Sequence, residues 1–209
     1  LDVTFALDRS GLVGEDGPTH SGNYDIAYLR CIPNMVICTP SDENETRKLL
    51  TTAYLHNGPA SVRYPRGTGP NSNVDKDLKP LKIGEANIIN EESSEIVILN
   101  FGTLLNEANQ ISKELKATLV DMRFVKPLDE KLLRKLFKKA KVFISIEDGS
   151  IMGGAGSAVQ EFASKENLNV RSILFGIPDK FIEHASREEM LVEAGLDVEN
   201  IKSKLSKLL

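Results

Sequence analysis

Short apolar segments of strand length alternate with longer segments of helical character along most of this 209-residue chain. This alternation predicts an α/β fold with mostly parallel sheets, because two parallel strands are joined by a crossover that is usually a helix. Strands with continuous apolar runs, such as residues 96–99, are expected to be covered by helices on both faces. The expected strands are 3–8 (buried), 35–39, 60–64, 85–90, 95–101, 118–121, 141–147 and 170–175. The expected helices are 22–32, one starting at 40–41 with Ser41 as N-cap, 104–116, 130–139, 154–165 and two short ones near the carboxyl end.

The segment 67–82 interrupts this alternation. It is polar and irregular and contains several glycine, proline, asparagine and serine residues. Such composition is typical of a linker between domains. We therefore expect two domains, 1–78 and 79–209, each with a mostly parallel sheet covered by helices. The hydrophobic fraction of 41% is enough to fill their cores.

Several classes of protein are not favoured by the sequence. The formal net charge of -4 argues against a nucleic-acid partner, and no apolar run approaches the ~18 residues of a membrane-spanning helix. Two cysteines, Cys31 and Cys38, cannot build a disulfide framework or a four-ligand zinc site alone, and suit a reducing cytoplasm. The chain opens at Leu1 directly on a strand pattern, which suggests that it is a fragment.

The densest group of polar side chains follows the first expected strand. It contains Asp8, Arg9, Asp16, Thr19 and His20 among several glycines. Ligand sites of open α/β sheets lie at the carboxyl ends of the strands, so this loop is a candidate binding site. The alternative interpretation, a polar surface loop with an arginine–aspartate pair, stays open at this point.

A second candidate follows the strand 60–64. Arg63 alternates with Tyr64 and is expected to be a solvated side chain of the strand, whereas Arg66 lies in the exit turn between Pro65 and Gly67. If the two strands share a sheet, Arg9 and Arg66 emerge at the same edge. Two guanidinium groups there would suit a phosphate dianion, since each can donate paired hydrogen bonds.

The glycine-rich turn at 153–156 follows a strand and precedes a helix, as in a dinucleotide-binding turn. The G-x-G-x-x-G pattern fails, however, because Val159 stands at its third glycine position. We expect the turn to serve close packing of the helix start. His56 and His184 are expected to be ordinary polar surface residues.

Long motifs of the chain resemble the 1-deoxy-D-xylulose-5-phosphate synthase family, which are transketolase-like thiamine diphosphate enzymes. The similar runs occur in the family's order and cover nearly the whole chain: DRSGLVGEDGPTHSGNYDIAYLRCIPNM, TPSDENE, GPASVRYPRG, ILNFGT, VDMRFVKPLDE, EDGSIMGGAGSAVQEF and GIPDKFIEHAS. The resemblance implies that 1–78 is the carboxy-terminal half of a pyrimidine-binding domain and 79–209 a transketolase-like carboxy-terminal domain.

This resemblance also implies a reaction, in which pyruvate and glyceraldehyde 3-phosphate condense to 1-deoxy-D-xylulose 5-phosphate and CO2 for isoprenoid, thiamine and pyridoxal biosynthesis. Arg9 and Arg66 correspond to residues that bind the acceptor phosphate. Asp16 and His20 correspond to residues that line the same pocket, with His20 in a catalytic role. The location implied is the cytoplasm, or the plastid stroma in a plastid-bearing source.

The family uses thiamine diphosphate and Mg²⁺, but its Gly-Asp-Gly motif and catalytic glutamate are not in this chain. No cofactor-binding or metal-binding residue is therefore assigned. The resemblance implies that the chain works with a missing amino-terminal part, as a homodimer, and is inactive alone. Two alternatives remain: a stand-alone, non-catalytic binding or assembly module, and the β subunit of a two-chain oxoacid dehydrogenase. The loop from Arg9 to His20 argues against the dehydrogenase, and the reading frame upstream of Leu1 would separate a fragment from a stand-alone module.

Overall fold

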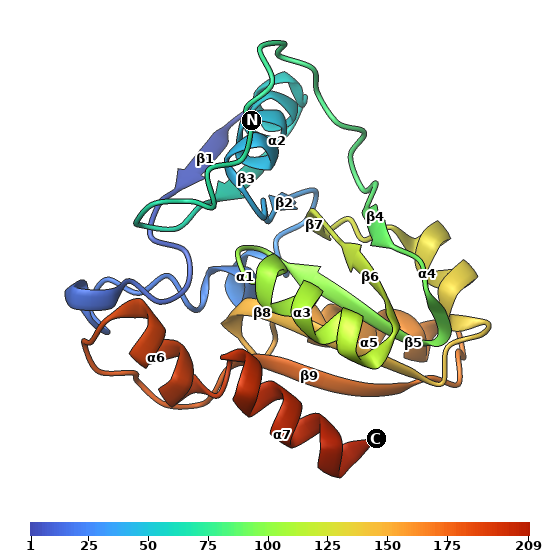
Figure 1. Cartoon of the computed structure of the whole chain (residues 1–209). Helices are drawn as coiled ribbons and strands as arrows, with labels where there is room; N and C mark the ends of the chain where they lie inside the picture. Colours follow the sequence, from blue (N-terminus) through green and yellow to red (C-terminus); the bar gives the residue numbers. More distant parts are fainter.

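The computed structural model describes the whole chain apart from the side chains of Ser93 and Ser94, and it contains two sheets (Figure 1). The first sheet has the strand order β1-β3-β2-β7. Strands β1, β3 and β2 run parallel, and β7 is antiparallel to β2. The bounds of these strands are β1 (Thr4–Leu7), β2 (Val36–Cys38), β3 (Ala60–Arg63) and β7 (Phe124–Lys126).

The second sheet has the order β4-β6-β5-β8-β9, and only β4 is antiparallel to its neighbour. Its strands are β4 (Asn87–Asn90), β5 (Ser93–Phe101), β6 (Ala117–Asp121), β8 (Val142–Ser150) and β9 (Arg171–Ile177). The α/β fold with parallel-dominated sheets, which the sequence predicted, is confirmed.

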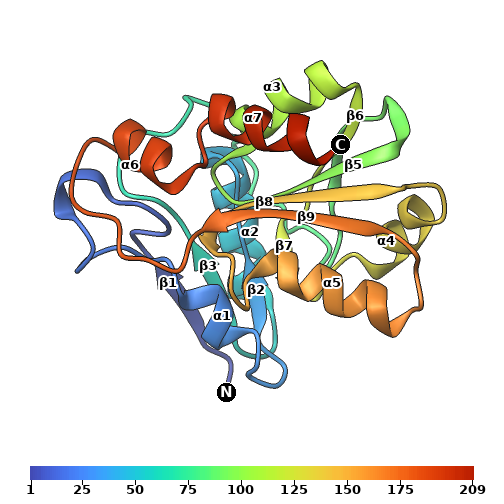
Figure 2. The same ribbon diagram turned by 90° about the horizontal axis from the view of Figure 1, so that it is seen from below.

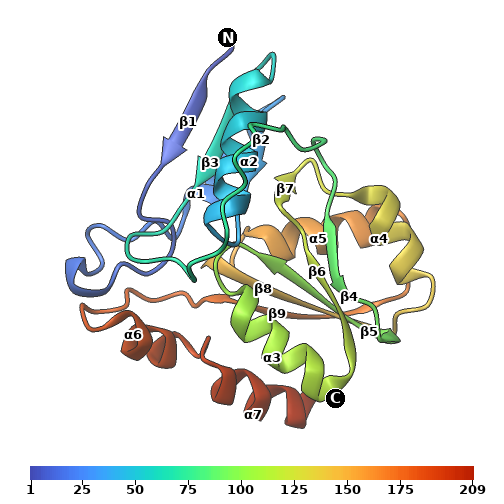
Figure 3. The same cartoon turned by 45° about the horizontal axis from the view of Figure 1, so that its top comes forward.

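Helices cover both faces of the second sheet (Figures 2 and 3). One layer consists of α3 (Leu105–Leu115), α6 (Arg187–Ala194) and α7 (Val198–Leu208). The other layer contains α1 (Asp25–Leu29), α4 (Glu130–Phe137) and α5 (Ala155–Lys165). Alternate residues of β5 serve the two layers: Ile98 packs with the first, and Val97 and Leu99 with the second. None of the helices in the described residues is long and apolar enough to cross a membrane.

The two halves of the chain share one core and one sheet. Ile26 of α1 and Ile37 of β2 belong to the same buried cluster as Val97 and Phe143 of the second sheet. Strand β7, which comes from the second half, pairs with β2 of the first half. β7 was not predicted from the sequence, because its apolar run, Phe124-Val125, has two residues, whereas the run at β2 (35–38) has four.

The first strand differs from expectation. β1 was predicted to be buried, but Phe5 is 45% exposed and Val3 38%. The reason is its position at the edge of the sheet, where it pairs only with β3. Its attachment to α2 (Glu43–Leu55) includes a hydrogen bond from Thr4 Oγ1 to the carbonyl oxygen of Ala53 (3.0 Å).

The N-cap of α2 also differs from the prediction. Asp42, not Ser41, caps this helix and accepts from the backbone N–H of Glu45 at 2.7 Å. Ser41 Oγ instead donates to Asp121 Oδ2 at 2.6 Å. Asp42 precedes the first helical residue directly and so occupies the position at which an aspartate satisfies the free N–H groups.

The irregular segment between β3 and β4 lies along α2. The carboxylate of Glu43 accepts from the backbone N–H groups of Asn71 (2.9 Å) and Ser72 (3.2 Å). These bonds tie the segment to the first unit. A division into domains 1–78 and 79–209 stays a prediction.

Candidate functional site

The carboxyl ends of β1 and β3 lie next to each other, since the two strands are parallel and Leu7 is in register with Arg63. Beyond the strands, the N–H of Ser10 donates to the carbonyl oxygen of Tyr64 at 2.9 Å. This bond holds the two exit segments together. As a result, the structure brings Arg9 and Arg66 to the same edge of the first sheet, as the strand pattern predicted.

Asp16, in the 3-10 turn Gly14–Asp16, bridges the two arginines. Its Oδ2 is 3.4 Å from Arg9 Nε, and its Oδ1 is 3.2 Å from Arg66 Nη1. Arg9 also pairs with Asp8. The side chains of Arg9, Arg66 and Asp16 are 40%, 47% and 24% exposed. We call Arg9, Asp16 and Arg66 the rim cluster, which is open to a solute.

The loop that carries Arg9 closes on Gly22. The N–H of Gly22 donates to the carbonyl oxygen of Arg9, and the N–H of Gly11 donates to that of Gly22, both at 2.9 Å. A Cβ on Gly22 would lie 2.4 Å from the Arg9 carbonyl oxygen, so this close approach requires glycine. Arg9 itself has a φ of 59°, which is uncommon for a residue with a side chain.

His20 lies on the same loop but is exposed, and its Nδ1 is 3.0 Å from Thr19 Oγ1. Among the contacts of the described residues, Asp16 bonds the arginines and not His20. His184, from the second half of the chain, packs against this loop: a Cβ on Gly17 would lie 3.0 Å from His184 Cβ. His184, expected to be an ordinary polar surface residue, therefore lies against the candidate loop, and no local sequence pattern indicates this proximity.

The largest difference between the expected and the observed surroundings of a side chain is at Arg63. It was expected to be solvated, but it is 2% exposed. Its Nε donates to Asp25 Oδ2 at 2.8 Å and its Nη2 to Asp25 Oδ1 at 3.0 Å, while its Nη1 pairs with Asp148. We call Arg63, Asp25 and Asp148 the buried cluster. β3 is an interior strand, and its end is enclosed by α1 and β8, so the alternation that suggested solvent does not apply.

The buried cluster extends into the second half of the chain. Asp148 Oδ2 accepts from the N–H of Thr103 at 3.0 Å and from Thr103 Oγ1 at 2.8 Å. Arg187 Nη2 in turn donates to Thr103 Oγ1 at 3.1 Å. Burial by itself would raise the pKa of Asp148, but the charge of Arg63 and the hydrogen bonds from Thr103 outweigh it and hold that pKa below its ordinary value.

The glycine-rich turn before α5 accommodates Glu147, a neighbouring buried carboxyl. Glu147 accepts from the N–H groups of Ala155 (2.7 Å) and Gly156 (2.9 Å) at the start of α5. Burial raises the pKa of Glu147 to about 7, against the lowering effect of these two bonds. A Cβ on Gly154 would lie 2.3 Å from Glu147 Oε2. The turn therefore serves close packing, as expected from the failed dinucleotide pattern.

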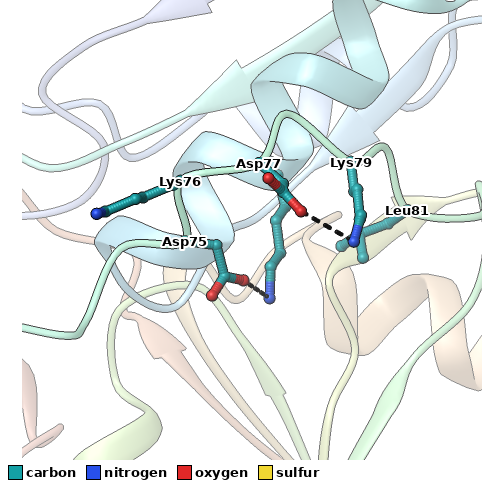
Figure 4. Close-up of a pocket in the computed structure, with 6 residues that line it drawn as sticks. Asp75, Lys76, Asp77, Lys79 and Leu81 are labelled. Carbon is teal, nitrogen blue, oxygen red and sulfur yellow. Dashed lines mark ion pairs between the residues drawn. The ribbon is translucent and has the colours of Figure 1, made fainter.

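A hollow of about 510 Å³ lies elsewhere, between α2 and the irregular segment (Figure 4). Its lining consists of Lys48, Asp75, Lys76, Asp77, Lys79 and Leu81. Lys48 pairs with Asp75 at 2.9 Å and Lys79 with Asp77 at 3.0 Å. The carboxylates in the hollow already have cationic partners, and none of the strand ends that carry the rim cluster reaches it. We therefore prefer the rim cluster as the functional site. No group of three or more His, Cys, Asp or Glu side chains that could hold a metal ion occurs among the described residues.

Comparisons with known proteins agree on the architecture. The family described as "Transketolase, pyrimidine binding domain" matches residues 1–71, and "Transketolase, C-terminal domain" matches residues 84–201. The solved structure titled "Split gene transketolase, inactive beta4 tetramer" has a TM-score of 0.80 at 25% identity, covering 99% of this chain and 66% of its own. A transketolase from Campylobacter jejuni has a TM-score of 0.72 at 20% identity, covering 98% of this chain and 31% of its own.

Curated relatives have closely similar sequences. A 1-deoxy-D-xylulose-5-phosphate synthase from Pseudomonas fluorescens is 53% identical over 203 residues, which are 97% of this chain and 32% of the relative. One from Pseudomonas paraeruginosa is 55% identical over 202 residues, again 97% and 32%. The chain thus spans about a third of the length of the relatives that it matches.

Proposed function

The chain belongs to the transketolase family, and we propose that it forms the carboxy-terminal part of a 1-deoxy-D-xylulose-5-phosphate synthase. Relatives of that name match nearly its whole length at 53% and 55% identity. The complete protein would condense pyruvate with glyceraldehyde 3-phosphate to 1-deoxy-D-xylulose 5-phosphate and CO2. We assign to this chain the binding of the acceptor phosphate and a part of the assembly surface, and expect it to be inactive alone.

The convergence of Arg9 and Arg66 carries this proposal. Both side chains are 40% or more exposed and meet at one carboxylate. A phosphate dianion would share the two guanidinium groups with Asp16, or displace it, because charge-assisted hydrogen bonds from paired N–H groups favour the more highly charged anion. The phosphate is remote from the reacting carbonyl, so the arginines would use its binding energy to fix the position of the aldehyde.

His20 and Asp16 are proposed to act on the reacting end of the acceptor. His20 is exposed on the loop that carries Asp16, so its ring is open to solvent. It would hydrogen-bond the acceptor oxygen on which negative charge develops, and thereby stabilise the transition state. Asp16, once released from an arginine, would accept a hydrogen bond from a substrate hydroxyl.

Thiamine diphosphate, when bound, supplies the chemistry that removes CO2 from pyruvate. No residue of this chain is assigned to the diphosphate–metal end of the cofactor, because the family's Gly-Asp-Gly motif and catalytic glutamate have no counterpart in its sequence. We propose that the missing amino-terminal part holds that end and that the complete protein is a homodimer. The free thiols of Cys31 and Cys38 and the bacterial relatives support a cytoplasmic location.

Steady-state kinetics of the complete enzyme would test the phosphate role. Arg66→Ala should weaken the use of glyceraldehyde 3-phosphate by roughly 1.5–3 kcal/mol in kcat/KM, the range for hydrogen bonds to charged groups. Glyceraldehyde without phosphate should be affected far less. Arg134→Ala, on α4, is the control, because Arg134 is 42% exposed and likewise forms ion pairs with carboxylates, at a site away from the rim cluster. Equal losses for both acceptors in Arg66→Ala would contradict the proposal.

A second arrangement is favoured by one comparison. The relative in the solved structure is titled a split-gene transketolase, so in that protein the enzyme is divided between genes. In this second arrangement the chain is likewise a separate, non-catalytic assembly module. The reading frame upstream of Leu1 decides between the two: a Gly-Asp-Gly motif and a catalytic glutamate in the same frame support a single long chain.

A further inference from the structure

We propose that Arg63 is a positioning residue for the acceptor phosphate, which acts by fixing Arg9 and Arg66 relative to each other. This inference rests on the proposed function and deepens it. Arg63 is shielded from solvent and does not line the rim cluster, so it is not expected to touch the substrate. Its side chain and its backbone nevertheless connect to both arginines of the rim through short series of hydrogen bonds.

The connection to Arg9 runs through Gly22. Arg63 Nη2 donates to the carbonyl oxygen of Gly22 at 2.9 Å. The N–H of the same Gly22 donates to the carbonyl oxygen of Arg9 at 2.9 Å. Arg9 is therefore two hydrogen bonds away from the buried guanidinium. Because Arg9 has a φ of 59°, its backbone needs such external bonds to hold it.

The connection to Arg66 runs along the chain. Arg63 is the last residue of β3, and Arg66 follows it by three residues. Between them, Tyr64 donates from its N–H to Leu7 and accepts from the N–H of Ser10, both at 2.9 Å. Anchoring the Arg63 side chain thus fixes the strand end from which the exit turn, and Arg66, begins.

The second half of the chain provides the anchor. Asp148 of β8 bonds Arg63 and is itself fixed by Thr103. The loop of Arg9 also rests directly on this residue, since a Cβ on Gly11 would lie 3.0 Å from the Asp148 carbonyl oxygen. The rim cluster, although built from the first 66 residues, is therefore positioned against a strand of the other unit.

Only arginine can occupy this position with all contacts satisfied. Three acceptors in different directions surround it: Asp25, Asp148 and the Gly22 carbonyl oxygen. A planar guanidinium presents five N–H donors in a fixed fork, whereas a lysine ammonium is a single point with three donors. Arg63→Lys would keep the buried positive charge but lose some of the hydrogen-bond donors of the guanidinium. The variant therefore tests the hydrogen-bond geometry separately from the charge.

The test compares Arg63→Lys with Arg123→Lys in the complete protein. Arg123 is a matched control, because it donates two hydrogen bonds to Glu45 (2.7 and 2.9 Å), is 14% exposed and also joins the two halves of the chain. It contacts neither the rim cluster nor the loop of Arg9. We expect Arg63→Lys to lower kcat/KM for glyceraldehyde 3-phosphate at least tenfold, with less than a threefold loss for unphosphorylated glyceraldehyde. Arg123→Lys should change both acceptors equally.

Equal losses for both acceptors in Arg63→Lys, or no loss, would overturn the inference. If Arg66→Ala is selective for the phosphorylated acceptor and Arg63→Lys is not, the proposed function stands and only the positioning role fails. Should Arg63→Lys not fold, Asp25→Asn keeps the side-chain shape and leaves the pair with Asp148. In that variant the rise of the unfolding midpoint with inorganic phosphate should be smaller than in Arg123→Lys, and an unchanged rise would refute the proposal.

Discussion

Arg63 and Arg66 are three residues apart, and each pairs with carboxylates, but their surroundings differ completely. Arg63 has a side chain that is 1% exposed and bonds Asp25 and Asp148, whereas that of Arg66 is 47% exposed and meets Asp16 at 3.2 Å. The buried ion pairs of Arg63 are not exchanged for other partners, because breaking them would leave an unpaired charge in a medium of low dielectric. Solvent makes the second exchangeable, because water or another anion can replace the carboxylate. The difference identifies which arginine supports the fold and which is available to a ligand.

From the difference between the buried and the exposed arginine, we expect the largest change in stability on substitution of Asp148. Asp148→Ala removes one of the two carboxylates around a buried guanidinium and should lower the free energy of unfolding by about 3–5 kcal/mol. Asp16→Ala removes the partner of the exposed arginines and should change it by less than about 1 kcal/mol. Urea unfolding of both variants measures the difference. Similar losses would show that burial does not separate the two clusters.

The strand pattern was sufficient to predict that Arg9 and Arg66 lie at one edge if their strands share a sheet, and it was not sufficient to predict the buried cluster. Arg66 follows a strand in a Pro-Arg-Gly turn, and parallel strands end at the same edge, so its meeting with Arg9 could be inferred from local sequence. Arg63 depends on Asp25 and Asp148, which are 38 and 85 residues away in the chain. No local pattern reports such partners, and alternation alone placed Arg63 in solvent.

The same limit explains what was missed in the fold. Most strands and helices were predictable, because their apolar residues recur with a period of two or of about 3.6. β7 has two consecutive apolar residues and pairs with a strand almost 90 residues earlier, for example at Ile37 and Lys126. The exposure of Phe5 depends on the position of β1 at the sheet edge, which the order of strands decides and the segment itself does not.

Another buried carboxyl, Asp121, extends the comparison to the dependence of stability on pH. Burial raises the pKa of Asp121 to about 7; the hydrogen bond from Ser41 and the charge of Arg123 lower it, and Glu45 raises it further. A folded pKa above the unfolded one of about 3.8 gives stability that is lost as pH rises toward 7. Asp148 has the opposite sign: its pKa is lowered, so its contribution is present at neutral pH and is lost in acid.

Between pH 5 and pH 8 the titration of Asp121 should lower the free energy of unfolding by about 3 kcal/mol, from roughly two pH units at 1.36 kcal/mol each. We therefore expect this decrease to be absent in Asp121→Asn. The amide keeps the shape and can still accept from Ser41. Urea unfolding at the two pH values measures this. If the variant showed the same pH dependence as the unchanged protein, Asp121 would not be a protonated, neutral acid in the folded protein at pH 5. Glu147, whose pKa is also about 7, contributes with the same sign and remains in both proteins.

A smaller difference in stability is expected between two glycines, Gly102 beside the buried cluster and Gly67 beside the rim cluster. Gly102 has a φ of 90°, and a Cβ there would lie 2.6 Å from Asp148 Oδ2, whereas Gly67 has a φ of 115° and no atom within 4 Å of its Cβ position. Gly67→Ala should lower the free energy of unfolding by about 1 kcal/mol for the backbone conformation. Gly102→Ala should lower it by a further 1–3 kcal/mol or so, because it also crowds the buried cluster. Thermal unfolding compares the two, and equal losses would mean that Asp148 can move away at little cost.

The smallest effect is expected at the rim cluster itself. Arg66→Ala should change the free energy of unfolding by less than about 1 kcal/mol, because the ion pair with Asp16 is partly solvated. Salt should reduce even that contribution, since the Debye length falls from about 10 Å at 0.1 M to about 3 Å at 1 M ionic strength. Urea unfolding at the two ionic strengths measures it. A stability loss of several kcal/mol that persists at 1 M salt would make Arg66 a second structural arginine. The exposed cluster would then no longer be free to exchange Asp16 for a phosphate, and the distinction between the two arginines would fail.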